Sequence, residues 1–183
     1  HRGIFTVLRK LKVFVAGDIG CYTLGAYPPL SSLHSNICMG ASISGAHGMT
    51  KALGEAGKGK IVGVIGDSTF LHAGVHPLID VAYNKSYATI LILDNRTTGM
   101  TGQQEHPATG YTISGETAHR IDFVELGRAL GIENPRKVNP WHLEETERVI
   151  KEELEKDDPS LVISEGPCIL LRRAFKKYNK PLQ

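Results

Sequence analysis

The sequence predicts a doubly wound α/β fold, in which a mostly parallel sheet carries helices on both of its faces. Short apolar runs of strand length alternate with amphipathic helical segments along the whole chain. Two of these runs, 61–66 and 88–93, are almost free of polar residues, as expected for strands covered on both faces. With 183 residues, of which 41% are hydrophobic and 22% charged, the chain is long enough for one domain with a substantial core.

The first half of the chain contains two predicted strands. Apolar residues at helical spacing indicate a short helix over 3–12, and the apolar run 13–16 indicates the first strand. A loop rich in glycine and proline follows, which no helix tolerates. The second strand is the run 61–66, which ends in Gly-Asp-Ser.

Small residues dominate the segment 38–56 between these strands. Gly40, Gly45 and Gly48 each lower helix propensity by roughly 1 kcal/mol relative to alanine. A helix that keeps three glycines is expected to need close backbone approach, either to the sheet or to a ligand.

The second half of the chain completes the alternation of strands and helices. An acidic cap at Asp122 and a glycine stop at Gly131 mark one helix clearly. The polar loop 96–118 is long, and loops of this length are usually functional or mobile. The other elements are expected as helices over 74–85, 122–131 and 141–156, and as strands over 88–93, near 137–138 and over 161–164.

Composition excludes several classes of protein. A net charge of +2 gives no sign of nucleic-acid binding, and no apolar run is long enough to span a bilayer. No signal peptide is recognisable. The three cysteines, Cys21, Cys38 and Cys168, have no metal-ligand spacing and indicate a reducing compartment, which we expect to be the cytoplasm.

We expect one domain over 1–171 and a basic tail over 172–183. Arg172, Arg173 and the lysines that follow are typical of a solvated segment, here a linker to a further domain. The chain begins at His1 rather than at methionine. We therefore expect it to have been cut from a longer protein.

Two polar side chains follow the ends of consecutive predicted strands. Asp67 ends the first of them and Asn95 the second, twenty-eight positions later. One βαβ step places parallel strand ends side by side, at the edge where open α/β sheets bind ligands. Taken singly, Gly66-Asp67 and Asn95 are typical of turns and helix caps. Together with a loop carbonyl they form a set of hard oxygen ligands that suits Mg²⁺ shared with a diphosphate.

The spacing of these residues resembles the signature of thiamine-diphosphate enzymes, usually Gly-Asp-Gly followed after about 24 to 27 residues by Asn. The segment 98–103 (TGMTGQ) and the segment 17–21 (GDIGC) are similar to 2-oxoacid:ferredoxin oxidoreductases. Together, 1–3 and 17–24 look closest to the large subunit of indolepyruvate:ferredoxin oxidoreductases. The resemblance extends over residues 1–171 and implies the thiamine-diphosphate-binding fold.

Carried over residue by residue, the resemblance implies a Mg²⁺ site at the strand ends. Asp67 and Asn95 would bind the metal through their side chains and Thr97 through its backbone carbonyl. The diphosphate would rest on backbone N–H groups near Ser68 and Thr69, where a helix N-terminus favours anions. Ser68 departs from the usual glycine, which leaves the loop geometry open. The cofactor-binding residues implied are Gly20, Cys21, Cys38, Met39, Gly40, Gly66, Asp67, Ser68, Thr69, Asn95, Thr97, Gly99, Met100 and Thr101.

Two further segments have a functional and a structural interpretation. Cys38-Met39-Gly40 resembles the element whose backbone meets the aminopyrimidine ring in related enzymes, and plain packing by small residues is an equal alternative. Gly20-Cys21 would approach the thiazolium. By residue type alone, Cys21 is more often a buried apolar residue than a reactive thiol.

The histidines give no clear catalytic assignment. Five lie in or near the predicted crevice, but no pair has ligand spacing with a third partner, so a structural role is expected for each. His34 and His72 are the first that we would mutate. The five are His34, His47, His72, His76 and His106.

In the resembled family this domain is one part of a larger enzyme. The glutamate that activates the cofactor comes from a second, pyrimidine-binding domain, so no catalytic residue is expected here. Iron–sulfur clusters lie in a region that follows, and 2-oxoacid, CoA, ferredoxin and a second subunit are the expected partners. Two other functions stay open: a domain of a non-oxidative thiamine enzyme of decarboxylase or transketolase type, and a non-enzymatic nucleotide-binding module. The absence of GxGxxG and GxxxxGK[ST] patterns disfavours the second.

Overall fold

The computed structural model of the chain describes residues 1–171 and contains one six-stranded sheet. All neighbouring strands are parallel, in the order β2-β1-β3-β4-β6-β5. The prediction of a mostly parallel sheet is thus confirmed. The strands are β1 (Phe14–Gly17), β2 (Ser35–Asn36), β3 (Ile61–Gly66), β4 (Thr89–Asp94), β5 (Arg136–Val138) and β6 (Ser160–Glu165).

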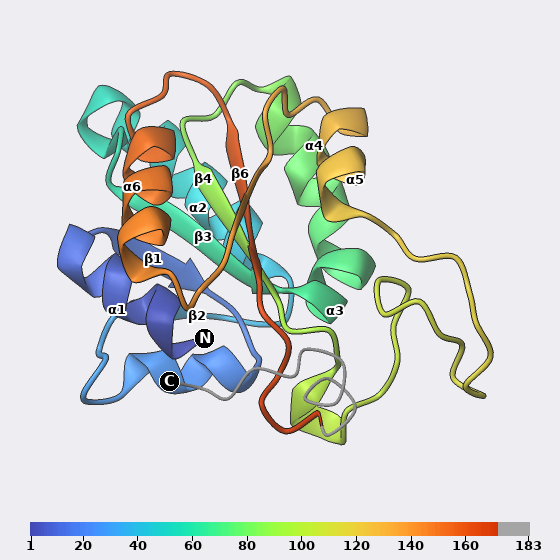
Figure 1. Cartoon of the computed structure of the whole chain (residues 1–183). Coiled ribbons are helices and arrows are strands. Elements are labelled where there is room, and N and C mark those ends of the chain that lie inside the picture. Colours follow the sequence, from blue (N-terminus) through green and yellow to red (C-terminus); the bar gives the residue numbers. More distant parts are fainter. Residues whose placement is uncertain (172–183) are drawn as a thin grey trace.

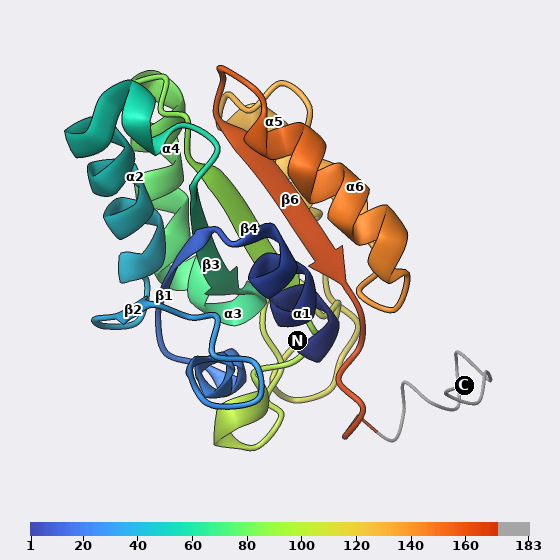
Figure 2. The same cartoon turned by 90° about the vertical axis from the view of Figure 1, so that its left-hand side faces the viewer.

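Helices cover both faces of the sheet, as Figure 2 shows. Alternate residues of the strands point to opposite faces, so each strand contributes to two cores. One core lies under α1 and α6, and the other lies under α2, α4 and α5. The helices are α1 (Arg2–Leu11), α2 (Ala41–Leu53), α3 (Asp67–Thr69), α4 (Val75–Tyr83), α5 (Phe123–Ala129) and α6 (Leu143–Leu154).

The order of the strands reverses at β1. The chain passes from β1 outward to β2, then returns across β1 to β3 on its other side. The carboxyl ends of β1, β3 and β4 therefore open side by side, which is the usual position of ligand sites in open α/β sheets. In Figure 1 this edge is the lower one, where α3 and the first residues of α1 lie.

Two elements differ from the sequence-based expectations. The two-residue strand β2 was not predicted, because two residues carry no periodic signal. The helix expected over 74–85 begins earlier, since α3 starts at Asp67 and continues through a π-helical segment, Phe70–Gly74, into α4.

Among the described residues, the expected close approach to the sheet is not found at two of the three glycines near α2. A Cβ on Gly45 or Gly48 would meet nothing within 4 Å. Gly40 does need glycine, because its φ is +89° and a Cβ there would lie 2.5 Å from that of Ala73. The close approach of α2 to the sheet is provided instead by Gly63 of β3, whose Cβ would lie 3.1 Å from that of Ala46.

The other predicted elements are present within one to three residues of their expected ends. Asp122 caps α5 as predicted, because its side chain accepts hydrogen bonds from the amides of Val124 and Glu125. The predicted tail over 172–183 lies outside the described residues. Within residues 1–171, no helix combines the length and the apolar character that crossing a bilayer requires.

Candidate functional site

Buried polar residues follow the carboxyl ends of the central strands, where the crevice is predicted. Asp18 follows β1, Asp67 follows β3 and Asn95 follows β4, and their exposed fractions are 0%, 3% and 9%. A polar group loses hydrogen bonds to water when it is buried, so each of these side chains needs a partner. Their partners define the site.

Asp67 joins the ends of β3 and β4. Its Oδ2 accepts hydrogen bonds from the backbone amides of Asn95, at 3.1 Å, and Arg96, at 3.0 Å. Its Oδ1 accepts from the amide of Ser68 at 2.8 Å. Arg96 has a φ of +65°, and this left-handed turn directs two successive amides toward one carboxylate. The two residues predicted to share a metal ion are therefore in direct contact.

The loop after Asn95 folds back over the start of α3. The carboxamide oxygen of Asn95 accepts a hydrogen bond from the amide of Thr97 at 3.2 Å. The hydroxyl of Thr98 donates to that of Ser68 at 3.0 Å, and this bond ties the predicted TGMTGQ loop to the Asp67 turn. The backbone of Thr97 is thus held beside both strand ends.

A second carboxyl group lies behind this turn. Asp94 is buried, and burial raises its pKa to about 7, opposed by Arg96 and assisted by the nearby charges of Asp67 and Glu165. Arg96 forms ion pairs with Asp94 and Glu165, and its Nε lies 3.2 Å from Asp94 Oδ2. Arg96 therefore balances part of the negative charge of these two acids, and Arg120 also lies 4.0 Å from Asp94.

Asp18 holds the turn that begins α2. Its Oδ2 accepts hydrogen bonds from the amide of Gly40, at 2.8 Å, and from the hydroxyl of Ser42, at 3.3 Å. Its Oδ1 has no hydrogen-bond partner among residues 1–171. Burial raises the pKa of Asp18 to about 6, although the bonds from Gly40 and Ser42 and the nearby His72 act in the opposite direction.

The predicted Gly20-Cys21 turn borders the same crevice. A Cβ on Gly99 would lie 3.4 Å from the sulfur of Cys21 and 3.6 Å from the side-chain carboxamide nitrogen of Asn95, so the three residues are neighbours. Burial raises the pKa of the Cys21 thiol, and the nearby Cys168 raises it further. A raised pKa keeps the thiol protonated, which favours the structural interpretation of Cys21 over a reactive one.

The remaining predicted residues lie at the rim. Cys38 is exposed, and Met39 and Met100 are about half exposed. Thr101 bonds within its own turn, donating to the side chain of Gln104 at 2.7 Å. These residues are within the edge where the crevice opens, but no hydrogen bond joins them to the Asp67 turn.

Two histidines contact the residues at the strand ends: His106, one of the five expected in or near the crevice, and His1, which was not among them. His106 Nε2 is 3.2 Å from Asp67 Oδ2, and both side chains are buried. The ring of His1 lies 3.5 Å from the carboxamide nitrogen of Asn95. Both are brought in by tertiary packing from distant segments, so no local pattern signals them.

The two histidines singled out from the sequence differ from each other. His34 Nδ1 accepts a hydrogen bond from the amide of Val15 at 3.0 Å, and its ring stacks on Phe14. This is the structural role that was expected. His72 is exposed and lies 3.1 Å from the carbonyl of Ser68, which places it at the mouth of the crevice.

The donors at the strand ends fit a hard divalent cation that shares its coordination sphere with a ligand. Asp67 supplies carboxylate oxygens, Asn95 a carboxamide oxygen and Thr97 a backbone carbonyl. In the described part of the chain, no three His, Cys, Asp or Glu side chains cluster as a metal site. The set therefore suits Mg²⁺ held together with phosphate oxygens rather than an all-protein cage for a transition metal.

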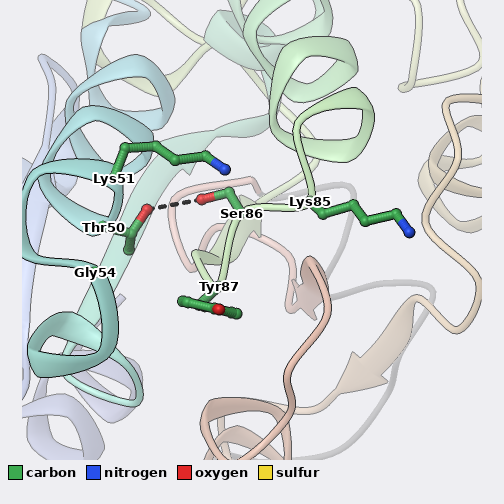
Figure 3. A pocket seen from close by; sticks show the side chains of 6 residues that line it. All are labelled: Thr50, Lys51, Gly54, Lys85, Ser86 and Tyr87. Atoms are coloured by element: carbon green, nitrogen blue, oxygen red, sulfur yellow. Dashed lines mark hydrogen bonds between the residues drawn. The ribbon is translucent and has the colours of Figure 1, made fainter.

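A separate pocket lies at the opposite end of the strands, before β4 (Figure 3). Most of its polar side chains are already paired: the hydroxyls of Thr50 and Ser86 lie 2.7 Å apart, and Lys51 donates to the carbonyl of Asn84. Tyr87 bonds Glu55. The lining residues are Thr50, Lys51, Gly54, Lys85, Ser86 and Tyr87.

Comparison with known proteins identifies the family to which the chain belongs. Residues 18–164 match the family model described as thiamine pyrophosphate enzyme, C-terminal TPP binding domain. The chain belongs to this family. The matched segment begins at Asp18 and contains Asp67 and Asn95, so the crevice lies within the part that defines the family.

Curated relatives of this family member carry the name indolepyruvate oxidoreductase subunit IorA. The protein from Archaeoglobus fulgidus is 42% identical over 186 residues, which cover 98% of this chain and 29% of that protein. The protein from Pyrococcus horikoshii is 42% identical over 185 residues, or 94% of this chain and 28% of its own length. The resemblance inferred from the motifs is confirmed. The chain spans about three-tenths of the length of these relatives.

Solved structures confirm the thiamine-diphosphate-binding fold. A 2-oxoglutarate:ferredoxin oxidoreductase from Magnetococcus marinus superposes with a TM-score of 0.77 at 17% identity, over 92% of this chain and 62% of that one. A benzoylformate decarboxylase from Polynucleobacter necessarius superposes with a TM-score of 0.64 at 15% identity, over 90% of this chain and 33% of that one. At these identities the likeness concerns the fold.

Proposed function

We propose that the crevice binds thiamine diphosphate through Mg²⁺, with Asp67, Asn95 and the carbonyl of Thr97 as protein ligands of the metal. The observation that carries this proposal is the pair of hydrogen bonds from the amides of Asn95 and Arg96 to Asp67. They bring the two halves of the motif into contact. A divalent ion there would offset the negative charge of Asp67 and attract a diphosphate.

The remaining predicted residues then surround the cofactor. Ser68 and Thr69, at the start of α3, would hold the diphosphate, beside Gly66 and the loop of Gly99, Met100 and Thr101. The turn Cys38-Met39-Gly40, which Asp18 anchors through the amide of Gly40, would contact the aminopyrimidine ring. Gly20-Cys21 would contact the thiazolium side.

The whole enzyme is, in this proposal, a 2-oxoacid:ferredoxin oxidoreductase that acts on indolepyruvate or a similar arylpyruvate and forms an acyl-CoA. The support is the name shared by relatives about 40% identical over nearly all of this chain. The rest of that enzyme supplies the activating glutamate, the iron–sulfur clusters and the second subunit. The three free cysteines of the described residues fit a reducing cytoplasm.

When bound, thiamine diphosphate supplies the electron sink that decarboxylation of a 2-oxoacid needs. The chain itself binds and orients. Asp67 fixes the two strand ends relative to each other, Asn95 and Thr97 present oxygens to the metal, and Asp18 fixes the turn at Gly40. The chain alone is expected to bind the cofactor weakly and to show no turnover.

Two alternatives predict different observations. A non-oxidative thiamine enzyme of decarboxylase or transketolase type shares the metal motif but needs no electron acceptor, so the flanking sequence would lack cysteine clusters. A nucleotide-binding module without metal would keep its affinity in Asp67→Ala. The family match disfavours the nucleotide-binding module, and the names of the relatives favour the oxidoreductase over the non-oxidative enzyme.

Calorimetry tests the proposal directly. Thiamine diphosphate is titrated into the chain with Mg²⁺ and again with a chelator, and binding is expected only with the metal. Asp67→Ala is expected to abolish it. Asp157→Ala is the matched control, because Asp157 is an exposed acid paired with Lys58. Binding that persists without metal, or in Asp67→Ala, would contradict the proposal.

A further inference from the structure

Tyr22 is a buried tyrosine whose hydroxyl is unpaired. The residue belongs to the 3₁₀ helix Cys21–Ala26 that follows β1, and only 3% of it is exposed. Its ring packs in the core under α1. The hydroxyl is buried as well, and within residues 1–171 it has no hydrogen-bond partner.

The phenol ring lies against the ends of both β1 and β3. A Cβ on Gly20 would lie 2.5 Å from Cε1 of the ring and 3.2 Å from Cζ, the carbon that bears the hydroxyl. A Cβ on Gly66 would lie 3.3 Å from Cε1. The hydroxyl oxygen is thus one bond beyond an atom close to Gly20, in the turn after β1, and two bonds beyond the atom close to Gly66, which directly precedes Asp67. Because both neighbours are glycines, neither interposes a side chain between the phenol and the crevice.

The ring is also held on its other side. The ring of His1 meets it edge to face, with centroids 6.1 Å apart, and His1 itself contacts the carboxamide of Asn95. Tyr22 therefore packs among residues of the crevice, not at a remote point of the core. Its position is fixed before any ligand binds.

An unpaired buried hydroxyl weakens a fold, because it has lost its hydrogen bonds to water and replaced none of them. Phenylalanine fills the same space without this cost. We infer that the Tyr22 hydroxyl is a ligand-positioning group that donates a hydrogen bond to an oxygen of the bound diphosphate. A neutral O–H donor beside Gly66 suits an anionic oxygen, because hydrogen bonds to charged acceptors are the stronger ones. This inference rests on the proposed binding of thiamine diphosphate.

The test is Tyr22→Phe, titrated by calorimetry with thiamine diphosphate and, separately, with inorganic diphosphate, both in the presence of Mg²⁺. The variant is expected to bind each ligand at least about tenfold more weakly, as for the loss of a hydrogen bond to a charged group. Without ligand, its melting temperature is expected to equal or exceed that of the wild type. Improved stability with impaired binding is a combination that a packing role does not produce.

Tyr87→Phe is the matched control, because Tyr87 bonds Glu55 at the opposite end of the strands and should leave both affinities unchanged. Unchanged affinity in Tyr22→Phe would overturn the inference while the proposed function stands. Weaker binding accompanied by a lower unliganded melting temperature would also overturn it, since it indicates a packing role. A wild-type chain that binds neither ligand would refute the proposed function, and the inference with it.

Discussion

Both ends of the sheet carry buried polar side chains, but the two ends differ in whether these side chains have hydrogen-bond partners among the described residues. At the amino end of β4, the buried hydroxyls of Thr50 and Ser86 pair with each other 2.7 Å apart (Figure 3). At the carboxyl ends of β1 and β3, Oδ1 of Asp18 and the hydroxyl of Tyr22 are buried without a partner in the described part of the chain. One end is complete by itself, whereas the other is not.

This difference in hydrogen bonding indicates which end of the sheet gains more from binding a ligand. A pocket whose polar groups are paired gains little from a ligand, because binding must break existing hydrogen bonds. A site with unpaired buried groups and a concentration of acids gains from each bond that a metal and a diphosphate provide. Mutations at the two ends should therefore separate stability from binding.

The largest effect is expected for Asp67→Ala. The backbone amides of Ser68 and Asn95 lose their acceptor, and the amide of Arg96 keeps only its second acceptor, Asp94. The free energy of unfolding should therefore fall by about 3 kcal/mol. Binding of thiamine diphosphate with Mg²⁺ should be lost. Urea unfolding measures the loss of stability, and calorimetry measures the loss of binding. A variant that kept its affinity would contradict the assignment of the ligand to the carboxyl ends of the strands.

Next in size is the effect of Gly40→Ala. Alanine at a φ of +89°, with its Cβ directed at Ala73, should destabilise the chain by about 2 kcal/mol. Gly45→Ala in the same segment meets nothing within 4 Å and should stabilise it by up to about 1 kcal/mol. Urea unfolding of both variants checks this. Equal changes in the free energy of unfolding would contradict the requirement for glycine in the turn that Asp18 holds.

A smaller effect concerns pH and Asp18. Its pKa is raised from 3.8 to about 6 in the folded chain, so its ionisation costs stability as the pH rises from about 4 through 6. Asp18→Asn removes this cost and still accepts the hydrogen bond from Gly40. Between pH 4 and pH 7 the wild type should lose on the order of 2 kcal/mol more stability than the variant. Parallel urea titrations at both pH values measure the difference, and identical pH profiles would contradict it.

The smallest effect is expected at the paired end. Ser86→Ala removes the partner of the Thr50 hydroxyl and should cost about 1 kcal/mol of stability. The affinity for thiamine diphosphate should not change, because the pocket lies at the other end of the strands. Calorimetry that detected a large loss of affinity would mean that the two ends are coupled.

Much of the fold was predictable, because apolar runs and helical spacing are local signals. The strands at 61–66 and 88–93 and the capped helix after Asp122 are present where the pattern predicts them. The strand β2 was not predicted, because two residues are too few to show a periodic pattern. The early start of the helix at Asp67 escaped too, because Gly-Asp-Ser is typical of turns as well as of helix starts.

The candidate site was predictable where it is made of strand ends. The contact between Asp67 and Asn95 follows from the topology of one βαβ step. The contacts of His1 and His106 depend on packing between segments far apart in the chain, and no spacing signals them. Gly45 and Gly48 suggested a close approach to the sheet that the described residues do not show. A glycine permits such an approach, but its presence in the sequence does not say whether the fold uses it.

The most direct test of the site is an amide NMR spectrum recorded with thiamine diphosphate and with Mn²⁺ in place of Mg²⁺. A paramagnetic ion broadens the signals of nearby amides. We predict selective broadening at Ser68, Asn95 and Arg96 only when both metal and cofactor are present, with Ser86 and Tyr87 unaffected. Broadening at the Ser86 end, or none at Asn95, would contradict a metal–diphosphate site at the carboxyl ends of the strands.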